Sequence, residues 1–151
     1  MHRRYLVVLG SLLPALALGQ AATTPGALTS PHPTLEHLSL DWEITGDGDL
    51  DGRVTVRFRE LGSSAWREAP PLVRVPGGSN EGFSWANRHA GSLFSLQPDT
   101  GYEVELRLDD PDGGGEVRTM TARTRPVPAI PAGASILPAT PADVDPPMGG
   151  P

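Results

Sequence analysis

The sequence predicts an all-β fold, a small seven-stranded β-sandwich, and three observations support that prediction. Apolar and polar side chains alternate strictly along residues 38–45, again along 53–59 and again along 102–108. A period of two places every second side chain on one face of a strand, whereas these positions cannot share one face of a helix. A turn at residues 96–102 leads into the third run, and 18 glycines and 17 prolines suit short strands joined by many turns.

Residues 1–21 have the features of a signal peptide. Arg3 and Arg4 form a basic start, residues 6–18 are largely apolar, and small residues that suit cleavage after Gly19 or Ala21 follow. The apolar run is too short for a membrane span of about 20 residues, and Pro14 interrupts it. We therefore expect an exported protein, secreted or periplasmic, that has no membrane anchor after cleavage.

Proline and small polar residues set the expected domain boundaries. Residues 22–33 carry Pro25, Pro31 and Pro33 among small or polar side chains, and they are predicted to be a linker. Residues 34–126 hold the periodic apolar pattern and are predicted to form the domain. Residues 127–151 are rich in proline without such a pattern, and a linker or disordered tail is predicted there.

Within the domain, turn residues divide the chain into short strands. Trp42 lies in the first strand, among the apolar side chains that alternate with polar ones. Pro70 and Pro71 cannot donate to a sheet and are expected to end the pairing of the hairpin strand that begins near residue 65. The remaining strands are expected at residues 72–75, 92–96, 102–108 and 116–124, with an irregular region at 76–89.

The turn at residues 96–102 predicts a tyrosine corner. Pro98 fixes φ for the turn, and the residues that follow it, including Thr100, form local hydrogen bonds or tolerate unusual backbone angles. Tyr102 is expected to bury its ring and to bond its hydroxyl to a backbone group upstream, near Leu96. The corner is therefore expected to hold two strands of the sandwich together.

These features resemble a fibronectin type III domain over residues 34–126, through Trp42, the 96–102 corner and the closing Thr124-Arg125-Pro126. Residues 40–44, 46–47, 54–59, 90–96 and 110–113 are similar to modules that precede right-handed parallel β-helix domains in exported bacterial proteins. The resemblance implies a spacer or docking unit rather than a catalyst. Because a proline-rich segment stands where a β-helix would follow, the chain is expected to be either a short protein or the N-terminal part of a longer one.

An acidic loop is the candidate metal site. Asp47, Asp49 and Asp51 alternate before Gly52, as in the first half of an EF-hand loop that binds calcium. The closing position of such a loop falls on Phe58, which has no side-chain oxygen. The preferred interpretation is a solvated turn, and no metal or cofactor is predicted.

A row of arginines is the candidate anion site. Arg53, Arg57 and Arg59 point outward from one strand. In a fibronectin-type sheet that strand lies beside the strand carrying Glu103 and Glu105, so cross-strand charge pairs are the simpler expectation.

Phe83 and Trp85 are the candidate ligand-binding residues, since they lie in a region rich in glycine, serine and asparagine. They could form a platform for sugar rings. The alternative, which the sequence favours, is that Trp85 folds back over the sandwich as part of its core.

No catalytic constellation is present in the sequence. The four histidines are scattered, the serines lack a nucleophile elbow, and there is no cysteine. A net charge of −6 argues against nucleic acid as a partner. The sequence therefore predicts a monomeric, non-catalytic interaction or spacer module with a protein or polysaccharide partner. The alternative is the accessory polysaccharide-binding module of a carbohydrate-active β-helix enzyme.

Overall fold

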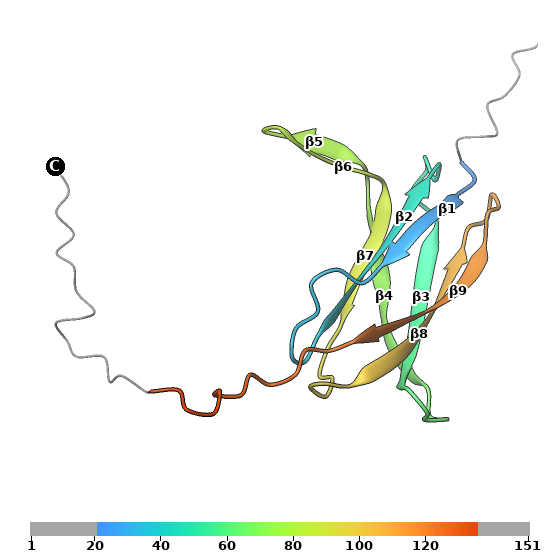
Figure 1. Ribbon diagram of the computed structural model, residues 1–151. Coiled ribbons are helices and arrows are strands. Elements are labelled where there is room, and N and C mark those ends of the chain that lie inside the picture. Colours follow the sequence, from blue (N-terminus) through green and yellow to red (C-terminus); the bar gives the residue numbers. More distant parts are fainter. Residues whose placement is uncertain (1–20, 136–151) are drawn as a thin grey trace, which may run out of the picture.

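The computed structural model describes residues 21–135, and these form an all-β sandwich of the predicted fibronectin type III-like class (Figure 1). Its strands are β1 (Thr24–Thr29), β2 (Leu38–Thr45), β3 (Arg53–Glu60), β4 (Arg67–Val75), β5 (Gly78–Asn80), β6 (Phe83–Trp85), β7 (Arg88–Leu93), β8 (Gly101–Asp109) and β9 (Glu116–Arg123). The predicted signal peptide, apart from Ala21, and residues 136–151 of the expected tail lie outside the described residues.

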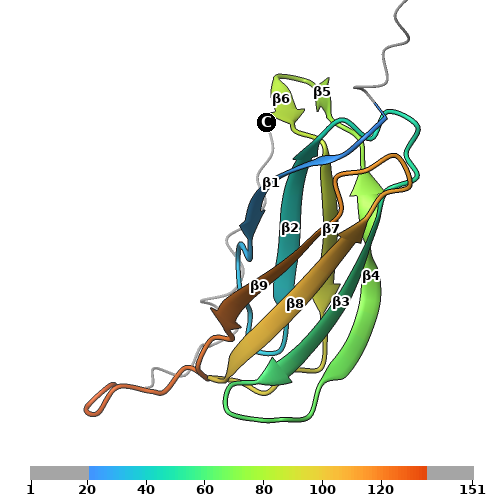
Figure 2. The same cartoon turned by 90° about the vertical axis from the view of Figure 1, so that its right-hand side faces the viewer.

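Two antiparallel layers face each other (Figure 2). One layer has the order β1-β2-β7 and the other the order β4-β3-β8-β9. Strand β4 joins them, because its first part pairs with β3 while Val73–Val75 pairs with β7. Strand β9, at the opposite edge, reaches β1 through a hydrogen bond from Arg118 to the Gly26 carbonyl. Both long sides of the sandwich are therefore bridged.

The predicted alternation places the core between the layers. Every second residue of β2, β3 and β8 is buried, as the period of two requires. Trp42 is 0% exposed and lies at the centre of this set. The core cluster contains Leu38, Leu40, Trp42, Val54, Val56, Phe58, Leu72, Leu93, Leu96, Tyr102, Val104, Leu106 and Leu108.

The turn before β8 is tied to the chain on both sides of it. The Tyr102 hydroxyl accepts a hydrogen bond from the Gln97 backbone N–H at 2.8 Å, and the ring packs edge-on against Phe58 with centroids 6.1 Å apart. The Thr100 hydroxyl donates to the Pro98 carbonyl at 2.9 Å. The Thr124 hydroxyl donates to the Gln97 carbonyl at 2.6 Å. The turn is thus fixed to the end of β9 as well as to its own strand.

The Tyr102→Phe substitution should destabilise the domain by about 1–3 kcal/mol, since the Gln97 N–H would lose its partner at a partly buried turn. The measurement is urea denaturation of both proteins at the same pH. The Thr100→Val variant, which loses a bond to the Pro98 carbonyl only two residues away, should cost less. Equal midpoints for wild type and Tyr102→Phe would contradict this role of the hydroxyl.

The linker predicted for residues 22–33 is wrong, because residues 24–29 form strand β1. It pairs with β2 on one side only and has an irregular register between Pro25 and Leu28. An edge strand tolerates proline and glycine because one row of its backbone groups needs no partner strand. Leu28 packs against the core, so this segment contributes apolar cover that its composition did not indicate.

The prediction that Pro70 and Pro71 end the pairing of β4 is also wrong. The pairing of β4 with β3 continues to Leu72, with an irregular register opposite residues 54–56. Prolines fit here because strand bulges and edges contain positions whose backbone N–H would have no partner in the sheet, and proline lacks that N–H. The irregular segment lies where β4 passes from one layer to the other, so it bends the strand rather than ending it.

Candidate functional site

The hairpin β5–β6 stands clear of the sandwich at one end (Figure 1). Its two strands pair only with each other, and each of the residues 78–86 is exposed. Phe83 is 79% exposed and Trp85 is 38% exposed. The expectation that Trp85 folds back over the sandwich is therefore wrong, since the hairpin holds the indole away from the core.

Local contacts nevertheless fix the geometry of this hairpin. The Trp85 indole N–H donates to the Pro76 carbonyl at 2.8 Å, and the Gly77 N–H donates to the Asn87 side chain at 2.5 Å. Gly78 faces Trp85 across the hairpin, where a Cβ would lie 2.8 Å from the indole ring. At the tip, Glu81 and Gly82 both have positive φ, the geometry of a type I′ turn.

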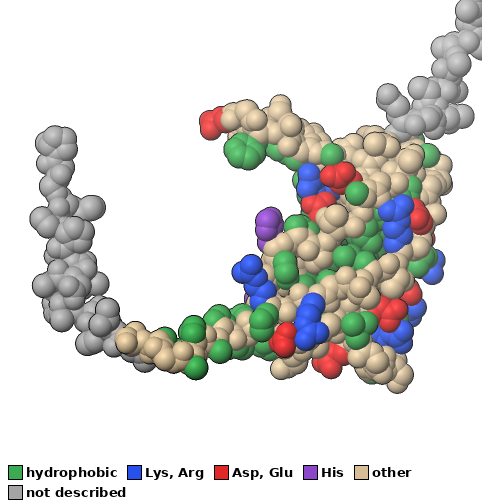
Figure 3. Space-filling model, viewed as in Figure 1, with side chains coloured by type: hydrophobic (Ala, Val, Ile, Leu, Met, Phe, Trp, Pro, Cys, Tyr) green, Lys and Arg blue, Asp and Glu red, His purple; other side chains and the backbone are tan. Residues whose placement is uncertain are grey.

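Both aromatic rings lie on one face of this hairpin. Phe83 and Trp85 are two residues apart in one strand, so their side chains point the same way about 7 Å apart along it. The surrounding side chains are mostly small and uncharged, with Glu81 as the one charged residue of 78–86. Figure 3 shows the hairpin projecting from the body of the molecule with hydrophobic side chains at its surface. The result is an exposed apolar platform with the Asn80 amide, opposite Phe83, on the same face.

Two of the three outward arginines of β3, Arg57 and Arg59, form the expected cross-strand pairs; Arg53 forms no ion pair within residues 21–135. Arg57 pairs with Glu105 at 2.8 Å and Arg59 pairs with Glu103 at 2.6 Å. Both guanidinium groups also lie over the half-buried Trp66 ring, 4.6 and 4.4 Å from its centroid. The hydrogen bond to Glu105 raises the pKa of Arg57, and the same bond lowers the pKa of Glu105. These charges stabilise one another, which favours the structural interpretation over an anion site.

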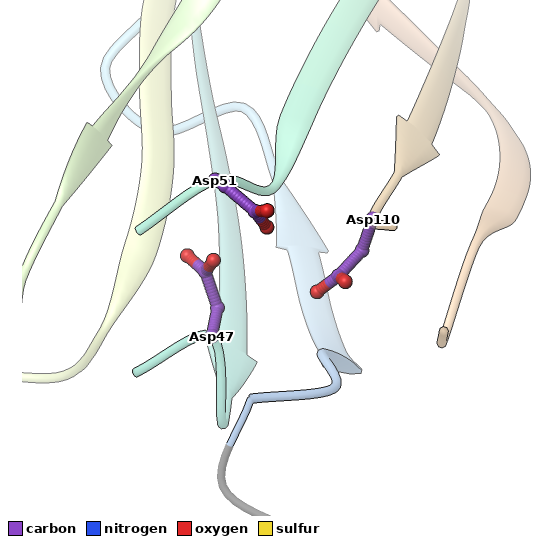
Figure 4. A group of neighbouring side chains, drawn as sticks. All are labelled: Asp47, Asp51 and Asp110. Carbon is purple, nitrogen blue, oxygen red and sulfur yellow. The ribbon is translucent and has the colours of Figure 1, made fainter. Parts of the chain in front are cut away.

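The acidic loop between β2 and β3 meets the loop between β8 and β9 at one end of the sandwich. Carboxylate oxygens of Asp47, Asp51 and Asp110 lie within 4.8 Å of one another (Figure 4). A second group, with the same limit, contains Asp49, Asp51 and Asp112. Sequence reasoning missed the two aspartates of the second loop. These two residues join the acidic loop because the sandwich topology brings the two loops together.

Asp47 has protein partners at this site. It is 0% exposed, forms an ion pair with Arg74, and accepts a hydrogen bond from the Gly52 N–H at 2.9 Å. Phe58, at the closing position of the EF-hand pattern, is buried in the core at 4% exposure. The loop therefore departs from an EF-hand at both of these positions.

His89 is a buried histidine that the sequence did not single out. It is 0% exposed, neither ring nitrogen has a hydrogen-bond partner within residues 21–135, and it pairs in register with Trp42 and Arg74. Burial lowers its pKa, the Arg74 charge lowers it further, and the Asp47 charge opposes the shift. The ring is thus held neutral inside the sandwich.

The domain should lose stability as the pH falls below about 6.5, the ordinary pKa of histidine. The unfolded chain takes up a proton at His89 in that range while the folded chain does not, so unfolding becomes easier. The slope should approach about 1.4 kcal/mol per pH unit. Urea denaturation between pH 7.5 and 5 measures it. The slope should persist in His37→Gln and disappear in His89→Leu; an unchanged slope in His89→Leu would contradict the assignment.

The comparisons with known proteins give similarity to solved structures alone. No family model matches the chain, and no curated protein matches it. A fibronectin type III domain of the human fibronectin type III domain containing protein 3 is 16% identical, with a TM-score of 0.46 over 79% of this chain and 93% of that one. The third fibronectin III domain of the human KIAA0343 protein is 14% identical, with a TM-score of 0.42 over 82% of this chain and 100% of that one.

A structure described as a myokine is similar as well, with 14% identity and a TM-score of 0.47 over 69% of this chain and 98% of that one. Among residues 21–135 there is no helix with the length and apolar character that crossing a membrane requires.

Proposed function

We propose that this chain is an exported, non-catalytic interaction or spacer module that contacts its partner through the β5–β6 hairpin. The observation that supports this most strongly is the exposure of Phe83 and Trp85 on a hairpin whose two strands, within residues 21–135, pair only with each other. Large exposed apolar side chains gathered in one place mark interaction sites on protein surfaces. The fibronectin type III-like fold suggests a binding or spacer role in the same direction.

The fixed shape of the hairpin supports a binding role. The indole bond to Pro76 and the close packing over Gly78 hold Trp85 in one orientation before any partner arrives. A platform ordered in advance loses less conformational entropy on binding than a flexible loop would. Phe83, which is the more exposed ring, then supplies most of the apolar area that a partner can cover.

A second candidate function is polysaccharide binding as the accessory module of a carbohydrate-active enzyme. The platform favours it because two rings on one face offer apolar contact to the faces of sugar rings. Asn80, which pairs with Phe83 across the hairpin, shares the face of the rings and can exchange hydrogen bonds with hydroxyl groups, whereas Ser79 and Ser84 point to the other face. A nearly uncharged surface of this kind suits a neutral, hydroxyl-rich ligand.

Retention on insoluble cellulose, chitin and xylan tests the second candidate. Under it, the wild-type protein is retained on at least one of them, and Trp85→Ala and Phe83→Ala each lower the retained fraction at least several-fold. Phe94→Ala is the matched control, because Phe94 is also exposed, at 57%, but lies outside the hairpin. Retention that is absent in the wild type, or unchanged in both hairpin variants, would remove polysaccharide binding.

The mass of the native product tests the spacer interpretation. An antibody raised against residues 34–126 would detect it in the exported fraction. A product near or slightly below 15.9 kDa fits a free-standing module. A much larger product would identify the chain as the front of a longer polypeptide, in which the sandwich spaces or docks another domain. Detection in the cytoplasm alone would contradict export.

A further inference from the structure

The start of strand β1 is fixed between two loops at one end of the sandwich. The Thr23 N–H donates to the Asp110 carboxylate at 2.9 Å and to the Gly113 carbonyl at 3.1 Å. The Thr23 hydroxyl donates to the same Asp110 oxygen, and Thr23 is only 2% exposed. Residues 22–23 are thus part of the folded domain rather than of the linker that their composition predicts.

Glycines in both loops make room for the backbone of these two residues. A Cβ on Gly46 would lie 2.1 Å from the Ala22 carbonyl oxygen, and a Cβ on Gly114 would lie 1.6 Å from the Thr23 carbonyl oxygen. No real side chain tolerates such distances. Both glycines also have positive φ. The two loops are therefore shaped around the chain at Ala22 and Thr23.

Negative charge surrounds the same position. The carboxylates of Asp47, Asp49, Asp51, Asp110 and Asp112 gather there. Within residues 21–135, one of these carboxylates forms an ion pair, namely Asp47 with Arg74. In the described part of the chain, Asp51 Oδ1 is buried and has no hydrogen-bond partner.

The pKa shifts of these carboxyl groups follow from that crowding. Burial raises the pKa of Asp51, and the charges of Asp49, Asp110 and Asp47 raise it further, against the effect of Arg53. The hydrogen bond with Asp49 raises the pKa of Asp112. Asp110 behaves differently: burial opposes ionisation, but hydrogen bonds from Thr23, Asp112 and Gly113 together lower its pKa. The cluster as a whole therefore has an excess of negative charge and would be stabilised by a cation.

We propose that signal-peptide removal between Ala21 and Ala22 supplies that cation, and that the new α-ammonium group of Ala22 is the counter-ion of the cluster. This rests on the proposed export of the chain. Hydrolysis breaks the Ala21–Ala22 amide bond; the water oxygen goes to the Ala21 carboxylate, and the Ala22 nitrogen takes up protons to become an ammonium group. A neutral amide is thereby replaced by a positive charge.

The geometry brings this charge within range of the cluster. Successive backbone nitrogens are at most about 3.8 Å apart, so the Ala22 nitrogen lies no more than about 7 Å from the Asp110 carboxylate. That separation is shorter than the screening length of about 8–10 Å at physiological salt. Cleavage therefore stabilises the mature domain relative to its precursor, even where the ammonium group and a carboxylate make no direct contact.

The test compares two preparations of the chain 22–151, one with a free amino group and one with Nα-acetylated Ala22. Acetylation removes the charge and adds only a small group. At pH 7 and low salt the acetylated form should melt about 1–5 °C lower. The ordinary α-amino pKa is about 7.7–8.0, and nearby carboxylates should raise it in the folded protein. The difference is therefore expected in full below that pH and should vanish as pH rises through the raised value.

Two variants separate a cluster effect from a general effect of acetylation. Asp49→Asn/Asp51→Asn should reduce the melting difference between the two forms, because it removes two of the charges that the ammonium group meets. Asp99→Asn should leave the difference unchanged. Asp99 lies in the turn before β8, pairs with Arg123 of β9, and is not part of the cluster. Equal melting temperatures for the free and acetylated forms would overturn the proposal.

Two further measurements distinguish the ways in which the proposal for the Ala22 ammonium group could fail. The first is the melting temperature with and without calcium chloride. If the free and acetylated forms melted alike without calcium and were stabilised equally by it, the cluster would be a metal site rather than the binding site of the amino terminus. N-terminal sequencing of the native protein should begin at Ala22. A start at Met1 would overturn export, and a start at Gln20 would overturn this cleavage position. The acetylation result tests the electrostatic part independently of either.

Discussion

The Arg74→Ala substitution should destabilise the domain by about 3–5 kcal/mol, one of the largest effects we expect from a single change. Arg74 is paired with Asp47, whose side chain is 0% exposed, and the Arg74 side chain is only 11% exposed. Arg74 also donates to the Asp47 carbonyl oxygen at 3.3 Å. Removing it leaves a carboxylate buried without its counter-charge. Urea denaturation at pH 7 measures the loss.

Arg57→Ala is the matched control for that experiment. Arg57 also pairs with a carboxylate, but the side chains of Arg57 and Glu105 are 43% and 21% exposed. Exposed ion pairs contribute about 0–1 kcal/mol, so this variant should remain close to the wild type in stability. Similar losses in the two variants would contradict the special role assigned to the buried pair.

The Trp42→Ala substitution should cost about 3–5 kcal/mol, the range for removing a large aromatic side chain from a core. Trp42 is 0% exposed and belongs to the set of residues that both layers bury. The Arg118 guanidinium lies 5.4 Å from the centroid of the Trp42 ring. Trp42 therefore also supports Arg118, the residue of β9 that is hydrogen-bonded to the Gly26 carbonyl of β1. The measurement is the free energy of unfolding, with circular dichroism to confirm that the variant folds.

Trp85→Ala is the control within the same residue type. Its indole is 38% exposed on the hairpin, outside the core, and its loss should lower the stability of the sandwich by less than about 1 kcal/mol. A large loss on Trp85→Ala would mean that the hairpin is structural. A small loss on Trp42→Ala would mean that the core is assembled around other residues.

The main features of the fold could be predicted because they depend on local patterns. Alternation along β2, β3 and β8 identified the inward side chains, since a strand has only two faces. The turn chemistry of residues 96–102 placed Tyr102 at the start of a strand, where its hydroxyl bonds to Gln97. The charge pairs of Arg57 and Arg59 followed from assigning neighbouring strands.

The edges of the sandwich could not be predicted in the same way. Strand β1 contains Pro25 and Gly26, and β4 contains Pro70 and Pro71, all residues that disfavour central strands. Their strand conformation depends on long-range pairing, since β1 is held by β2, and β4 is held by β3 and β7. A local pattern contains no information on such partners.

The candidate sites show the same limit. Phe83 and Trp85 could be identified from composition, but whether they face the core or solvent depends on the register of a short hairpin. The acidic loop was visible in the sequence, whereas Asp110 and Asp112 join it only because the topology brings two distant loops together. Buried His89 carries no local signal, because its surroundings come from three strands.

Chemical-shift mapping by NMR tests the central claim, that the β5–β6 hairpin is the binding surface. The ¹⁵N-labelled protein would be titrated with soluble oligosaccharides of the polysaccharide that retains it, or with the protein partner if none does. We expect the shifts to be confined to the amides of residues 78–86 and to the Trp85 indole N–H, which the Pro76 carbonyl holds in place. Shifts centred on the β3–β8 face or on β9, with the hairpin unchanged, would contradict the claim.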